Sequence, residues 1–184
     1  MGSLLPPPLP ILLQLGIDPA RIRLIKPISR RSQCRAVVNW LTQSSPSPDA
    51  SNFEQVQGYL QAFQHLCDID EHERAATLIS TRLATEIDSS LHYNLKVWGY
   101  SQDLIKLYEA LIDHISPKEN GRFLHCLGTC HQILGNISEA KIYLERSLSI
   151  AQELGNSIDA GTVLCSLGDV YYVLGDYDQA INHQ

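Results

Sequence analysis

A stretch of twenty residues occurs twice in this chain, at a spacing of forty residues. Residues 121–140 and 161–180 agree at seven positions, among them the pair Gly128/Gly168. A fixed period of this length is typical of stacked helix pairs, in which each pair is too small to bury its apolar face alone. The repeat therefore predicts an all-α fold, an α-solenoid of antiparallel helix pairs.

Helix-start and helix-stop residues divide residues 51–184 into about three and a half such pairs, the last of them incomplete at its C-terminal side. Ser116-Pro117 with Glu119 predicts a helix start near Pro117. Gly135 and Gly155 predict helix ends, because glycine readily takes the left-handed conformation that closes a helix. The third pair is thus expected over residues 117–154.

Two finer predictions concern packing and capping. Gly128 and Ala140 are expected at a close crossing of the third pair, where larger side chains would force the helices apart. Asp70 and Glu73 are expected to form a capping box at the start of an earlier helix.

Residues 1–50 differ in composition from the rest of the chain. They hold a proline run and carry six Lys or Arg against two acids, whereas residues 51–184 carry eight against eighteen. Proline-rich and serine-rich composition favours an extended, irregular backbone. We therefore expect a loosely ordered, basic N-terminal arm, with a short alternating run at residues 21–25 and a helix near residues 34–41.

The apolar start and the cysteines bear on the compartment. The first sixteen residues lack a charged segment and are interrupted by four prolines, so they predict neither a signal peptide nor a membrane span. Five cysteines without a secretory signal favour free thiols in a reducing compartment. The sequence therefore indicates a cytoplasmic protein.

The repeated motif resembles the tetratricopeptide repeat. The sequence Leu167-Gly168-Asp169-Val170-Tyr171, followed by Leu174-Gly175 and Gln179-Ala180, carries the resemblance, and the copy at residues 127–140 carries it more weakly. The forty-residue spacing is similar to the long-helix variety found in bacterial multidomain signalling and adaptor proteins. The resemblance implies a superhelix that acts as a protein-interaction scaffold within a larger regulatory protein.

The resemblance also implies a concave groove, lined by the first helix of each pair. Carried over position by position, the candidate partner-binding residues are Tyr93, Lys96, Arg122, His125, Thr129, Gln132, Thr162, Asp169 and Tyr172. Their mixture of cations, amides and aromatic rings suits a partner peptide or helix with acidic groups. The alternative is that they are ordinary exposed residues.

Other chemistries receive less support from the sequence. Cys126 and Cys130 lie four residues apart on one predicted helix, but no second pair of ligands completes a metal site. His72 has Ala76 where a metalloprotease motif needs its second histidine. No phosphate loop or nucleophile motif is present, so we expect no cofactor and no enzyme activity.

Two further expectations remain open. The alternative function is an accessory nucleic-acid-binding segment that uses the basic residues Arg21, Arg23, Lys26, Arg30, Arg31 and Arg35. The incomplete fourth pair is expected to leave an apolar stripe uncovered and to favour self-association through the C-terminal end. That stripe is predicted to hold Val163, Leu164, Leu167, Val170 and Tyr171.

Overall fold

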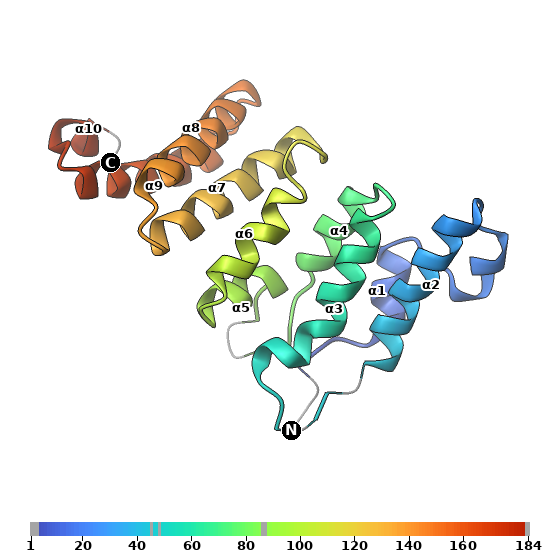
Figure 1. Cartoon of the computed structure of the whole chain (residues 1–184). Helices are drawn as coiled ribbons and strands as arrows, with labels where there is room; N and C mark the ends of the chain where they lie inside the picture. The colour runs from blue at the N-terminus through green and yellow to red at the C-terminus, as the bar shows by residue number, and fades with distance from the viewer. Residues whose placement is uncertain (1–3, 45, 48, 86–87, 183–184) are drawn as a thin grey trace. The chain divides into compact units, whose positions relative to one another are not determined.

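The computed structural model describes residues 4–44, 46–47, 49–85 and 88–182. Their regular structure is helical, apart from one isolated bridge between Arg82 and Ser90. The chain divides into two compact units, Met1–Gly99 and Tyr100–Gln184, each of which is described by itself. Figure 1 shows the helices in chain order from blue to red. The all-α class predicted by the repeat is confirmed.

The first unit contains five α-helices and one 3-10 helix among its described residues. Helix α2 packs against both η1 and α3, and α3 packs in turn against α4. The elements are α1 (Pro8–Gln14), η1 (Pro19–Leu24), α2 (Ile28–Gln43), α3 (Asn52–Cys67), α4 (His72–Ile79) and α5 (Leu91–Val97).

Residues 1–50 form more structure than the irregular arm predicted for them. Pro8 and Pro19 occupy the first turns of α1 and η1, where a missing N–H removes no intrahelical bond. The alternating run at residues 21–25 falls largely within η1, and α2 is longer than the short helix expected there. Apolar residues in this segment are buried: Ile11, Leu12, Leu15, Ile17, Ile22, Cys34, Val37 and Leu41.

Helix α3 lies close to α2 at Gly58. A Cβ atom built on Gly58 would lie 2.7 Å from the Ser44 Cβ and 2.8 Å from the Trp40 carbonyl oxygen. Contacts this short leave no room for a side chain. The end of α2 therefore packs directly against α3.

The capping box predicted for Asp70 and Glu73 is wrong. Asp70 takes a positive φ of 58° in the turn, and α4 starts after Glu71, which makes no side-chain cap. The Glu71 carboxylate instead pairs with Arg30 and, at 3.3 Å, with Arg74. Glu71, the acidic residue at the start of α4, is thus engaged in a tertiary ion pair and not in a helix cap.

The second unit holds the repeat. Helix α8 packs against both α7 and α9, α6 packs against α7, and α10 packs against α9. The elements are α6 (Ser101–Glu109), α7 (Pro117–Ile133), α8 (Ile137–Glu153), α9 (Ser157–Leu174) and α10 (Tyr177–Asn182). Both predicted glycine stops are confirmed, because Gly135 and Gly155 have φ values of 81° and 64°.

The close crossing of α7 and α8 lies where the repeat predicted it. A Cβ atom on Gly128 would lie 2.7 Å from the Leu144 Cγ and 3.2 Å from the Ala140 carbonyl oxygen. Ala140 itself is fully buried. This crossing sets how closely the two helices approach.

The apolar stripe expected to lie open on α9 is largely covered. Val163, Leu167, Val170 and Tyr171 are buried in a core with Ala140, Leu144 and Ala180, so that prediction is wrong for these four residues. Helix α8 covers them from one side, and the short α10 contributes Ala180. The exposed apolar residues at this end are instead Tyr172, Val173, Leu174, Tyr177 and Ile181.

Candidate functional site

Helices α7 and α9 are the first helices of two consecutive pairs, and they meet directly. The Nε2 atom of His125 lies 2.9 Å from the Oγ atom of Ser166, within hydrogen-bonding distance. Arg122 and Thr162 lie about one turn earlier on the same two helices. Three of the predicted groove residues, Arg122, His125 and Thr162, are therefore brought together.

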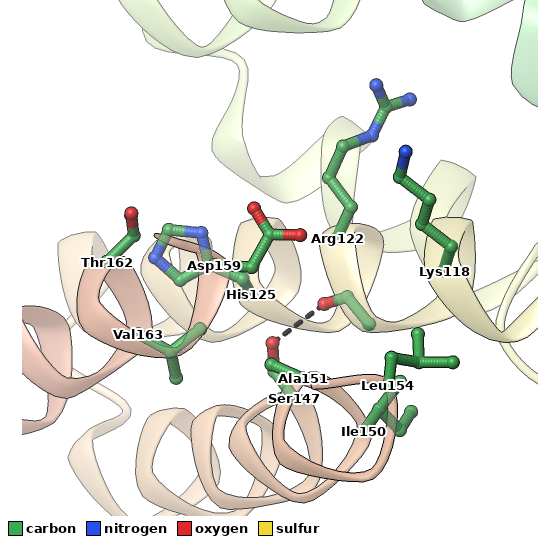
Figure 2. A pocket seen from close by; sticks show the side chains of 11 residues that line it. Lys118, Arg122, His125, Ser147, Ile150, Ala151, Leu154, Asp159, Thr162 and Val163 are labelled. Carbon is green, nitrogen blue, oxygen red and sulfur yellow. Dashed lines mark hydrogen bonds between the residues drawn. The ribbon is translucent and has the colours of Figure 1, made fainter. Parts of the chain in front are cut away.

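A cavity of about 50 Å³ opens beside these residues, between α7, α8 and α9 (Figure 2). Helix α7 contributes polar and charged side chains, α8 contributes mainly apolar ones, and α9 contributes both kinds. The lining residues are Lys118, Gly121, Arg122, His125, Ser147, Ile150, Ala151, Leu154, Asp159, Thr162 and Val163.

The inner wall of the cavity is apolar. Ala151 and Val163 are buried, and Ile150 is half-buried beside them. The buried Ser147 hydroxyl donates to the Gly121 carbonyl oxygen at 2.7 Å, so its hydrogen-bonding need is met within the wall. Gly121 also keeps the space open, because a Cβ atom there would lie 3.0 Å from the Ile150 Cγ2.

The mouth of the cavity carries charged side chains. Figure 2 shows Lys118 and Arg122 extending away from the apolar wall. The Arg122 guanidinium pairs with Glu119 at 2.6 Å and lies 4.8 Å from the ring centroid of Phe123. On α9, the Asp159 carboxylate accepts a hydrogen bond from the Asn156 side chain, whose oxygen in turn accepts from the Asp159 N–H.

The remaining predicted groove residues of this unit lie further along α7 and α9. The Thr129 hydroxyl donates to the Cys126 carbonyl oxygen of its own helix, and Gln132 is half-buried. On α9, Asp169 is exposed and Tyr172 is 65% exposed. The Tyr172 ring packs edge-on against Tyr177, with 5.7 Å between centroids.

Tyr93 and Lys96 belong to the first unit, on α5, and are not part of this cavity. The Lys96 ammonium lies 4.9 Å from the Tyr93 ring centroid, which is a cation–π contact within one helix.

Sequence reasoning missed the α8 wall of the cavity and both charged residues nearest the helix starts, Lys118 and Asp159. One sequence feature could have indicated the part of the cavity wall that α8 forms. Ser147 and Ala151 are small residues four positions apart on α8, and both line the cavity together with Gly121 of α7. Small residues on facing helices leave space when no larger neighbour fills it.

The basic residues of the first fifty are partly engaged with the chain itself. Arg30 pairs with Glu71, Arg21 lies 3.7 Å from Asp18, and the Arg31 Nε donates to the Ile25 carbonyl oxygen. The two ion pairs offset part of the charge that Arg21 and Arg30 can offer to a phosphate.

Cys126 and Cys130 take part in the packing of the helices. Cys130 is buried, and Cys126 interacts with Tyr108, whose pKa is raised mainly by burial. Within the described ranges, no three His, Cys, Asp or Glu side chains gather as metal ligands would. All five cysteines are free. No described helix is long and apolar enough to cross a membrane.

Stacked antiparallel helix pairs whose first helices share one face define an α-helical repeat scaffold. Residues 121–184 match the family model described as "Tetratricopeptide repeat", so this segment of the chain is similar to the repeats of that family. Repeats of this family generally mediate protein–protein interaction, and the family is a non-enzymatic scaffold. A search of curated proteins found no match to the chain.

Proposed function

We propose that the face shared by α7 and α9 binds an extended segment or a helix of a partner protein. The observation that carries the proposal is the contact between His125 and Ser166 at 2.9 Å. This contact joins the first helices of two pairs, so side chains from both are available to one partner. Recognition in such a groove combines anchoring side chains with a few oriented polar contacts.

The residues on this face suit that task. Arg122 and His125 offer donors near the cavity, and Asp169 and Tyr172 offer a carboxylate and an exposed aromatic ring further along α9. Tyrosine and arginine are enriched among interface residues that contribute most to affinity. We also propose that the chain works in the cytoplasm as part of a larger signalling protein. Its free cysteines support a reducing compartment.

Photo-crosslinking tests the groove. A benzoylphenylalanine in place of Asp169 should crosslink to a partner in cells, whereas the same residue in place of Gln152, exposed on α8, should not. Once a partner is captured, replacing Arg122, Gln132 and Tyr172 together with alanine should weaken binding by about 2 kcal/mol or more. Full affinity in a folded triple variant, or crosslinks only from α8, would contradict the proposal.

A further inference from the structure

We infer that the cavity between α7, α8 and α9 takes one short branched aliphatic side chain of the partner, flanked in the partner by an acidic and a basic residue. This inference rests on the proposed function and names the motif that the groove selects. It is carried by the size of the cavity, the chemistry of its wall and the charges at its mouth.

The volume limits the occupant to a few atoms. One water-sized group needs about 10–15 Å³ of such space, so a cavity of about 50 Å³ holds roughly three to five of them. The side chains of valine, leucine and isoleucine have three or four carbon atoms. A phenylalanine ring requires the walls to move.

The wall favours an apolar occupant. Ile150, Ala151 and Val163 present carbon atoms, and the one buried hydroxyl, that of Ser147, already donates to the Gly121 carbonyl oxygen. A polar group placed here would lose its hydration without gaining a partner. An aliphatic group loses no hydrogen bond on entry.

The mouth carries opposite charges on its two helices. The Arg122 charge is offset by Glu119 at 2.6 Å, whereas Lys118 has no ion pair among the described residues. Asp159 accepts a hydrogen bond from the neutral side-chain amide of Asn156, which does not offset its charge. The mouth therefore offers an ammonium on α7 and a carboxylate on α9, which complement an acid and a base in the partner.

The charges of Lys118 and Asp159 contribute more to specificity for the partner sequence than to affinity. Both groups are exposed, and exposed ion pairs contribute little to affinity. A partner with two acids would also meet the excess of carboxylates in residues 100–184, which hold eleven Asp and Glu against five Lys and Arg. The mixed motif avoids that repulsion.

Selection from a random peptide library displayed on phage, with the full chain immobilised, tests the inference. The enriched peptides should share valine, leucine or isoleucine between one acidic and one basic residue. Gly121→Ala adds a methyl group to the cavity wall and should weaken the selected peptides about tenfold. Gly161→Ala is the matched control, because it is the equivalent repeat position and a Cβ there meets nothing within 4 Å.

Reversing one charge tests the flanking residues. Lys118→Glu should move the preference towards peptides with basic residues on both sides. Thermal melting of each variant confirms folding. Enrichment of aromatic anchors, equal binding to the Gly121→Ala variant, or an unchanged charge preference in Lys118→Glu would overturn the inference.

A second groove variant, Asp169→Lys with Tyr172→Ala, distinguishes a failure of the pocket inference from a failure of the proposed groove function. Peptides that lose binding to this variant but not to Gly121→Ala would leave the groove standing without the pocket. Peptides insensitive to both variants, or no enrichment at all, would overturn the groove and the pocket together.

Discussion

The Nε2 atom of His125 and the Oγ atom of Ser166 lie 2.9 Å apart, on helices that are first in their respective pairs. The two helices are otherwise held mainly through α8, which packs against both. This contact therefore fixes how α9 is placed along α7 at the height of the cavity. The side chains that we propose to contact one partner depend on that alignment.

Removing this contact should loosen the groove. We expect Ser166→Ala to lower the free energy of unfolding by about 0.5–1.5 kcal/mol, the usual net contribution of one hydrogen bond. Urea unfolding of the full chain measures the change. Ser149→Ala serves as control, because its hydroxyl reaches only Glu153 on its own exposed face. Equal effects of the two substitutions would mean that the contact does not hold the helices.

The close crossing of α7 and α8 should not tolerate added volume. Gly128→Ala and Ala140→Leu are each expected to destabilise the chain by about 1–3 kcal/mol, because the backbone of α8 must shift to admit them. Thermal melting provides the measurement. Gly161→Ala, which points into open space, should be neutral or stabilising because alanine favours the helix. An unchanged melting temperature for Ala140→Leu would show that the register is wrong.

A buried asparagine links the end of the α6 region to α7 and α8. The Asn120 side chain donates to the Asp113 carboxylate at 3.1 Å and accepts from the Asp113 N–H at 3.0 Å, and Arg146 reaches the same carboxylate at 2.9 Å. The hydrogen bond from Asn120, followed by the contribution of Arg146, holds the pKa of Asp113 below its ordinary value of 3.8. We expect Asn120→Ala to cost about 1–3 kcal/mol near neutral pH.

The pH dependence has a defined sign. Because the pKa of Asp113 is lower in the folded state, its contribution to stability is present above about pH 4 and is lost as the pH falls further. The difference in unfolding free energy between the native chain and Asn120→Ala should therefore narrow in acid. NMR titration of the Asp113 carboxyl group checks the cause, and a pKa that stays low in the variant would contradict it. Arg146→Ala should raise that pKa less.

Self-association through the C-terminal end remains a prediction, but the residues to test have changed. Tyr172, Val173, Leu174, Tyr177 and Ile181 are exposed together on α9 and α10, and contiguous apolar surface of this kind favours contacts. We expect sedimentation of the full chain to depend on concentration in the micromolar range. Ile181→Lys should reduce that dependence, whereas Ile142→Lys on α8 should not. A sedimentation coefficient that does not change with concentration would contradict self-association.

The sequence predicted the helix pairs of the second unit because their signals are local. Gly135 and Gly155 end helices through backbone conformation alone, and Pro117 starts one for the same reason. The errors arose where distant residues decide the outcome. Asp70 lies in the turn before α4, where Glu71 binds Arg30 of another helix. The cavity forms where Gly121 lies beside Ser147 and Ile150 of α8. Local sequence patterns do not predict such contacts between distant residues.

Gly58 has a practical consequence for anyone who trims this chain. Its backbone lies so close to Ser44 and Trp40 that α3 has no side chain there to cover its own surface. A shortened protein that starts at residue 51 would retain the whole tetratricopeptide match yet expose a bare strip of helix to water. The binding behaviour of such a fragment would report on the loss of α2 as well as on the groove.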